Sequence, residues 1–242
     1  SPVTSNTKET VIVRTIGTVV VKDMIDFCID FVEDYPFMRS RIDKLINESL
    51  ALRIDQQVLL GSGVAPEMFS IDSYSSEFSA ANPACDVSAS IQAANYIDLV
   101  SAMATQIIEL GQQNAYDPNV VIVNKCDWFK EVESLKDLDN NYLDTRVARD
   151  INGMPTINGM RVVWSPLVPQ NELYVLDSNK GEILDRRDIT IDVAFENRDN
   201  FESELATIKG RARLNLLVDV NNQNAFMKCS DVATAIAAIT KP

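Results

Sequence analysis

The longest periodic stretch of the sequence is residues 36–60, which reads PFMRSRIDKLINESLALRIDQQVLL and is followed by Gly61-Ser62-Gly63. Proline suits the first turn of a helix, and glycines just after a periodic run end it. Apolar residues recur in two rows, one spaced by four and one by seven: Met38, Ile42, Ile46, Leu50, Ile54 and Val58 in the first, and Leu45, Leu52 and Leu59 in the second. At 1.5 Å per residue the predicted helix is about 37 Å long, and its two rows predict burial on more than one side.

The rest of the first half alternates between strands and helices. In chain order we expect a strand over residues 10–21, a short helix capped by Asp23 and ending near Glu33, an extended connector over 64–87, a helix over 88–113, a central strand over 120–124 and a helix over 126–135. Met24 and Cys28 are spaced to share one face of the short helix.

Strands dominate the second half. Ile157-Asn158-Gly159-Met160 predicts a hairpin, since both central positions of a type I′ turn need positive φ. A turn over 177–181 separates short strands over 173–176 and 182–184. Over residues 208–220 apolar and polar side chains alternate, which predicts a strand with one core face and one wet face. We expect a last strand over 225–229 and a weakly anchored tail after residue 231.

Charge and composition exclude several classes of protein. The 242 residues carry a formal charge of −13 and include no histidine. The negative charge opposes tight binding to nucleic acid or an anionic membrane, and the missing histidine removes the commonest general base and zinc ligand. No apolar run of about eighteen residues exists, so we expect no membrane-spanning helix. Four cysteines without a CxxC pair suit reduced packing thiols in a reducing compartment.

Two motifs suggest ligand sites and fail on inspection. Oxygen-bearing residues alternate at Asp137, Asp139, Asn141 and Asp144, as in a calcium loop. That loop needs glycine where Tyr142 stands and glutamate where Ala148 stands, so a plain acidic turn is favoured. The Gly61-Ser62-Gly63 segment follows a helix, whereas phosphate-binding loops precede one, so these glycines are interpreted as terminators.

One charged pattern and two catalytic candidates remain. Lys209, Arg211 and Arg213 share one strand face, which is either solvated or a contact for nucleic acid or a neighbouring chain. In a neighbouring copy the opposite charge would come from Glu196, Asp199, Glu202 and Glu204. Glu131 and Glu133 are surface-like, and Cys126 has no histidine partner. We therefore predict no catalytic, cofactor-binding or metal-binding residues, and no cofactor.

The order of these elements resembles the major capsid proteins of tailed bacteriophages, the Hong Kong ninety-seven type fold. The resemblance covers roughly residues 9 to 229. It rests on the long helix closed by Gly-x-Gly, a helix, strand and Trp-containing helix, then Leu135-Lys-Asp-Leu-Asp-Asn-Asn-Tyr142, Ile157-Asn-Gly-Met-Arg-Val-Val163, Trp164-Ser-Pro-Leu-Val-Pro169, Ile208-Lys-Gly-Arg-Ala-Arg213 and Ala225-Phe-Met-Lys228.

The resemblance implies an α+β fold in which the long helix, called the spine helix, packs on an elongated sheet. It implies a peripheral domain over residues 9–62 and 191–229 with the spine helix at 36–60, a connector over 63–85, a mixed α/β axial domain over 86–190 and a C-terminal tail over 230–242. The family also has an N-terminal arm and an extended loop ahead of the first strand. We expect both to be missing here, which would leave this chain monomeric or weakly associated.

The function implied is that of a structural shell subunit, not an enzyme. It would assemble with copies of itself into hexamers and pentamers of an icosahedral head that encloses DNA, with scaffold, portal and packaged DNA as further contacts and no membrane partner. Its location would be the virion capsid, and the host cytoplasm before assembly. One alternative is the shell of an encapsulin-like bacterial nanocompartment. A remote alternative is a soluble hydrolase that uses carboxylates or Cys126.

Overall fold

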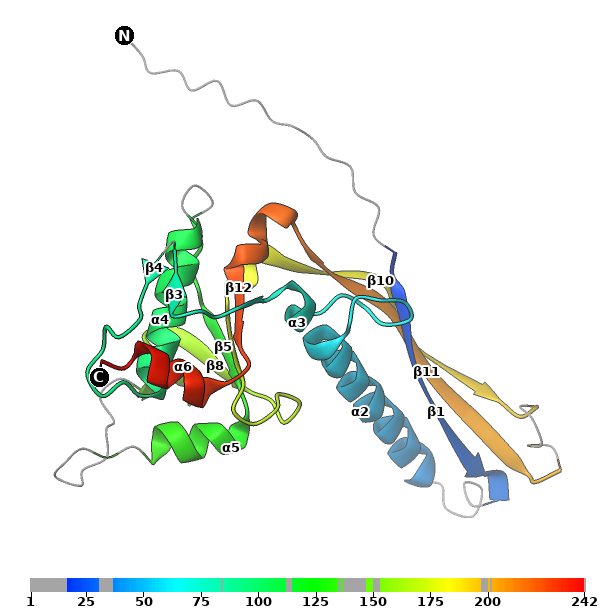
Figure 1. Ribbon diagram of the computed structural model, residues 1–242. Coiled ribbons are helices and arrows are strands. Elements are labelled where there is room, and N and C mark those ends of the chain that lie inside the picture. Colours follow the sequence, from blue (N-terminus) through cyan, green and yellow to red (C-terminus); the bar gives the residue numbers. More distant parts are fainter. Residues whose placement is uncertain are drawn as a thin grey trace, which may run out of the picture.

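The computed structural model describes residues 17–30, 37–83, 85–111, 115–134, 136, 147–149, 153–196, 200 and 202–241. The chain forms two bodies joined at an angle (Figure 1). One is built on a three-stranded sheet and the other on a seven-stranded sheet. Along the described residues the chain passes between the two bodies at three places. These are the segment after the long helix, the turn near residue 180 and the turn near residue 220.

The first body consists of a long antiparallel sheet and one long helix. Its elements are β1 (Val19–Cys28), β10 (Gly181–Ala194), β11 (Leu205–Val218) and α2 (Phe37–Leu60). The strand order is β1-β11-β10, so β11 is central and the other two strands are edges. The predicted helix over residues 36–60 and the predicted alternating strand are both confirmed.

The four-residue apolar row of α2 packs on the sheet. Ile46 and Leu50 are fully buried, and a Cβ added at Gly210 of β11 would lie 3.2 Å from Ile46 and 3.4 Å from Leu50. The absence of a side chain at this glycine therefore lets the helix approach the strand closely. Ile42 and Ile208 complete the contact toward the start of the helix.

The second apolar row of α2 is buried only at its end. Leu59 is 6% exposed, but Leu45 and Leu52 are 46% and 59% exposed. The prediction of burial on more than one side is therefore wrong for the single chain over most of the helix, because only one sheet face meets it.

The second body is a mixed sheet covered by helices (Figure 1). Its strand order is β2-β12-β9-β5-β8-β7-β6. The strands are β2 (Ser76–Glu77), β5 (Val120–Val123), β6 (Val147–Arg149), β7 (Pro155–Ile157), β8 (Met160–Trp164), β9 (Leu173–Leu176) and β12 (Phe226–Cys229). The expected central strand is confirmed as β5, and the Asn158-Gly159 hairpin is confirmed with φ of 50° and 84°.

Short helices and one long helix surround this sheet. They are α3 (Ile71–Tyr74), α4 (Tyr96–Gly111), α5 (Lys125–Asp127) continuing as a π-helix over Trp128–Glu133, 3₁₀ turns over Ser178–Lys180 and Val220–Ala225, and α6 (Val232–Ile239). A small two-stranded sheet pairs β3 (Ala81–Asn82) with β4 (Cys85–Asp86). The core centres on α4 and β5, where Met103, Ile107 and Val121 are fully buried.

Three predicted elements are wrong. The short helix expected from Asp23 is the second half of strand β1, in which Asp23 points to α2 and accepts hydrogen bonds from Ser49 and Arg53. The helix expected over 88–113 begins at Tyr96, and Ile91 instead bridges to Thr240.

The third wrong prediction is the weakly anchored tail expected after residue 231. It contains α6, which is capped by Asp231 and buries Val232, Ala235 and Ile239. A connection expected to be wholly extended, over 64–87, also holds α3 and three short strands. The expected strand over 10–21 is described only from residue 17 on.

Sheet membership differs from the expected domain bounds at two points. Strand β10 crosses the boundary expected at residue 190 and lies wholly in the three-stranded sheet. Strand β12, expected in the peripheral domain, lies in the seven-stranded sheet. The division into peripheral and axial domains itself stays a prediction.

Candidate assembly surfaces

The three-stranded sheet presents a row of cations on the face opposite α2. Strand partners point to the same side of a sheet, so the register places Lys22, Arg187, Lys209, Arg211 and Arg213 together on this face, here called the basic face. The predicted sharing of one face by the three β11 cations is confirmed, and the structure adds one cation from each edge strand. Sequence spacing within β11 could not identify those two additions.

The basic face brings like charges opposite one another. Lys22 lies directly across from Arg211, and Arg187 lies directly across from Arg213. Such cross-strand pairs are destabilising, because directly opposite Cβ atoms are only about 5 Å apart. The Nε of Arg213 is also buried, and it has no hydrogen-bond partner among the described residues.

Three carboxylates on the same face offset part of this charge. Asp192 forms an ion pair with Arg211 at 3.2 Å, and Asp26 accepts a hydrogen bond from Thr207. Glu182, directly across from Leu217, lies on this face too, so five cations against three carboxylates leave it positive, although the whole chain is strongly negative. A surface of opposite sign to the rest of the chain is suited to a contact with an anionic partner.

The helix-facing side of the same sheet has an uncovered apolar strip. Helix α2 packs on β1 and β11, leaving the inward side chains of β10 in solvent: Ile183 is 54% exposed, Ile191 38% and Val193 51%. Leu45 and Leu52 of α2 and Val20 and Met24 of β1 are exposed as well. Large exposed apolar patches are typical of surfaces that contact other molecules.

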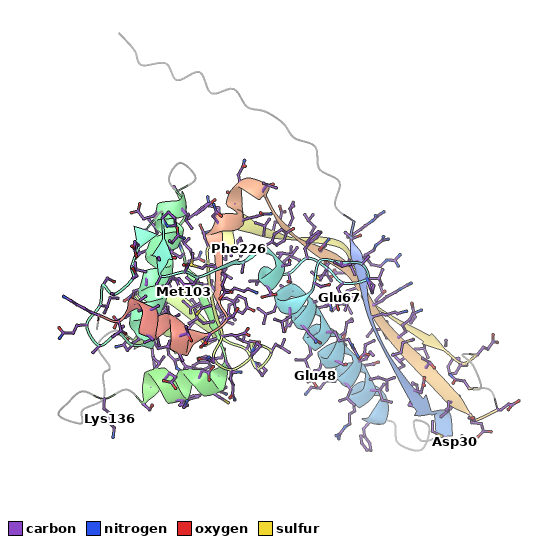
Figure 2. All side chains as sticks on the ribbon, viewed as in Figure 1. Asp30, Glu48, Glu67, Met103, Lys136 and Phe226 are labelled. Atoms are coloured by element: carbon purple, nitrogen blue, oxygen red, sulfur yellow. The ribbon has the colours of Figure 1, made fainter. Side chains whose placement is uncertain are left out.

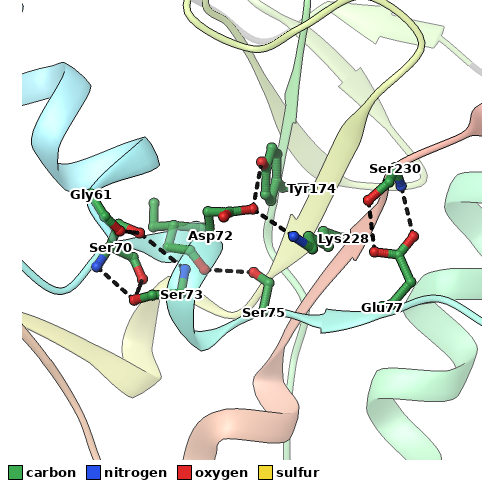
Figure 3. Close-up of polar contacts among 10 residues, drawn as sticks. Gly61, Ser70, Asp72, Ser73, Ser75, Glu77, Tyr174, Lys228 and Ser230 are labelled. Carbon is green, nitrogen blue, oxygen red and sulfur yellow. Dashed lines mark hydrogen bonds and ion pairs between the residues drawn. The ribbon is translucent and has the colours of Figure 1, made fainter. Parts of the chain in front are cut away.

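A polar cluster fixes the segment that leads from the spine helix into the seven-stranded sheet (Figure 3). Asp72 of α3 accepts hydrogen bonds from Tyr174 Oη at 3.1 Å and from Lys228 Nζ at 2.9 Å. On the other side of α3, Ser70 Oγ donates to the carbonyl of Gly61 at 2.5 Å. These contacts tie the end of α2 to β9 and β12, so they set the angle between the two bodies.

A second carboxylate extends this cluster. Glu77 of β2 accepts hydrogen bonds from the amide and the hydroxyl of Ser230, both at 2.8 Å (Figure 3). The hydrogen bond from Lys228 to Asp72 raises the pKa of the lysine, and burial raises the pKa of the Glu172 carboxyl beside them. No pattern in the sequence singled out this cluster, because its members come from four segments of the chain.

The remaining candidates are separate from these surfaces. Glu133 accepts a hydrogen bond from Trp128 Nε1 at 3.0 Å and lies 3.4 Å from Arg149, while Cys126 is exposed. Gly61 and Gly63 end α2, as predicted. The four residues weighed as calcium ligands lie outside the described residues.

Within the described ranges the structure shows no group of three or more acidic, cysteine or histidine side chains close enough to hold a metal ion. Over the same ranges, none of the helices has both the length and the apolar character to cross a membrane.

Comparison with known sequences agrees with the resemblance seen in the sequence. The sequence model of the Phage capsid family matches residues 3–231. The major capsid protein of Enterobacteria phage HK97 is 24% identical over 191 residues, which cover 76% of this chain and 44% of that protein. The chain thus spans less than half the length of this curated relative.

Solved structures share the fold. A chain from Mycobacterium phage Bobi superposes with a TM-score of 0.61 at 15% identity, over 88% of this chain and 71% of its own. One from Gordonia phage Cozz gives 0.63 at 11% identity, over 93% and 78%. The SrpI encapsulin complex from Synechococcus elongatus PCC 7942 gives 0.56 at 12% identity, over 89% and 75%. With its HK97-like mixed α+β architecture and a family match along nearly its whole length, the chain belongs to the Phage capsid family.

Proposed function

We propose that the chain is the structural shell subunit of a tailed phage or prophage, and that copies of it assemble into an icosahedral head enclosing DNA. The family match over residues 3–231 is the observation that carries this proposal. Its location is then the virion capsid, after a period in the host cytoplasm. Hexamers and pentamers of the same chain are the proposed assembly units, with scaffold and portal proteins as further partners.

The shape of the molecule supports this function. A shell subunit needs broad surfaces and a body that loses little freedom on assembly, because ordering flexible parts costs free energy. Here α2 is about 36 Å long and is clamped along the sheet by Ile46 and Leu50. The Asp72 cluster ties that rod to the second body.

We further propose that the three-stranded sheet with α2 is the peripheral domain and that the seven-stranded body is the axial domain. The strand order of the two sheets supports this division. In it, residues 181–194 belong to the peripheral domain and residues 226–229 to the axial domain.

Electron microscopy tests the function. The chain is expressed from its gene together with any residues encoded beyond it, purified and imaged in negative stain at several salt concentrations and pH values. Closed particles of uniform diameter are expected. Material that stays monomeric under all these conditions would contradict the proposal.

One alternative has a specific observation in its favour, which is the fold shared with the SrpI encapsulin complex. A nanocompartment shell would enclose protein cargo, whereas a phage head encloses DNA. Particles isolated from the native host separate the two: nuclease-protected DNA of defined length supports the phage head, and a co-purifying enzyme without DNA supports the nanocompartment.

A further inference from the structure

The first body carries opposite charges at two separate places. One is the basic face. The other is the end of the sheet farthest from the second body, where β1 and β10 end and β11 begins (Figure 2 labels Asp30 there). Four exposed carboxylates among the described residues mark this acidic end: Asp30, Glu196, Glu202 and Glu204.

These two charged regions do not neutralise each other within one molecule. Seven residues of extended chain separate Glu204 from Arg211, which corresponds to about 23 Å at 3.3 Å per residue. Physiological salt screens exposed charges over about 8 Å. The carboxylates of the acidic end therefore contribute little to the potential at Lys22, Arg211 or Arg213.

Repulsion among the cations of the basic face destabilises the chain while this face has no binding partner. Its Lys22–Arg211 and Arg187–Arg213 pairs place like charges directly opposite each other. Among the described residues the sheet supplies one ion pair to this face, between Arg211 and Asp192. Carboxylates of a binding partner would relieve this repulsion between the cations. That relief would add to the free energy of binding.

We propose that the basic face of one copy binds the acidic end of a second copy in a head-to-tail contact. The inference rests on the proposed function and names the surfaces that would meet in the shell. Charge complementarity between two regions that lie too far apart to pair within one chain carries it. A second copy of the chain supplies the matching carboxylates itself, because Glu196, Glu202 and Glu204 are exposed on every copy. A contact between two different surfaces can repeat from copy to copy, as a ring of subunits requires.

The test uses two charge-reversal variants and one control. The face variant is Lys22→Glu with Arg187→Glu, and the end variant is Glu196→Lys with Glu202→Lys. The control is Lys44→Glu with Lys241→Glu, which changes the net charge by the same amount as the face variant at exposed positions outside both regions. Sedimentation velocity at several protein and salt concentrations gives the concentration at half-association.

The face variant has an unusual expected signature. Each substitution turns a like-charge cross-strand pair into an opposite-charge pair, so the thermal midpoint of the isolated chain should rise. The same variant should need at least about tenfold more protein to associate, because two attractive charges become repulsive. A substitution that merely damaged the fold would lower the midpoint.

The end variant should lose association to a similar degree, and the control should keep it. Mixing the face and end variants should raise association above that of either variant alone, because the carboxylates introduced on the face then meet the lysines introduced at the end. Association of the wild-type chain should weaken as salt rises from 50 to 500 mM. If association recovers in the mixture and in neither variant by itself, the basic face of one copy must contact the acidic end of another.

Three outcomes would overturn the inference, and the first two leave the proposed function standing. Wild-type and face-variant chains that form particles equally well would remove this contact but leave the shell function intact. A face variant that loses only DNA binding would assign the face to nucleic acid. A wild-type chain that neither associates nor forms particles would contradict both proposals.

Discussion

Two leucines of the same helix should differ strongly in how much their truncation destabilises the chain. Leu50 is fully buried between α2 and β11, and Leu52, half a turn away, is 59% exposed. Leu50→Ala removes buried methyl groups and leaves a cavity beside Gly210, so we expect a loss of about 3–4 kcal/mol in the free energy of unfolding. Leu52→Ala should cost less than about 1 kcal/mol, since most of its side chain already meets water.

Urea denaturation of the dissociated chain measures both effects. With an m-value of about 2.5 kcal/mol/M for a chain of this size, Leu50→Ala should lower the midpoint by about 1.2–1.6 M, and Leu52→Ala by less than about 0.4 M. Hydrogen exchange should show that the Leu50 variant loses protection first in the amides of α2. Midpoints within 0.3 M of each other for the two variants would refute packing of this helix on one side only.

Three further predictions concern other parts of the molecule. Gly159 has a φ of 84°, so Gly159→Ala should destabilise the fold by about 1 kcal/mol, while the Gly17→Ala control, whose added Cβ meets nothing within 4 Å, should be nearly neutral in thermal melts. Burial raises the pKa of the Cys229 thiol to about 11, so a thiol-reactive dye at pH 8 should label the exposed Cys126 rapidly and Cys229 only after denaturation; equal rates in the native chain would contradict this burial. Burial also raises the pKa of Glu172, so its contribution to stability is present below the pKa of about 4.3 in the unfolded chain and is lost as the pH rises through the higher folded pKa; Glu172→Gln should therefore stabilise the chain at pH 7, with an advantage that disappears near pH 4 in pH-dependent urea titrations.

The long helix, the alternating strand β11, the central strand β5 and the Asn-Gly hairpin could all be predicted from local patterns. Each has a strong period or a turn that only certain residues adopt. The alternation of β1 was missed because Asp23 occupies an inward position, where an apolar residue would mark the strand. Its carboxylate accepts hydrogen bonds from Ser49 and Arg53 of α2, and the sequence of the strand alone does not predict these contacts.

The C-terminal helix could have been found. Asp231 caps it through Thr234, and its inward residues Val232, Ala235 and Ile239 have helical spacing. The cross-strand cations were partly accessible: the β11 stripe was visible in the sequence, but Lys22 and Arg187 join it only through pairings between distant strands. The Asp72 cluster likewise depends on tertiary contacts.

The pairing of β1 with β11 has a consequence for how the chain is made. Val19 lies opposite Leu214, which is 195 positions later in the sequence. At synthesis rates of about 5–20 residues per second, the first strand waits roughly 10–40 s for its partner to leave the ribosome. During that interval the apolar row of α2 has no sheet to cover it, so newborn chains should depend on chaperones far more than finished ones.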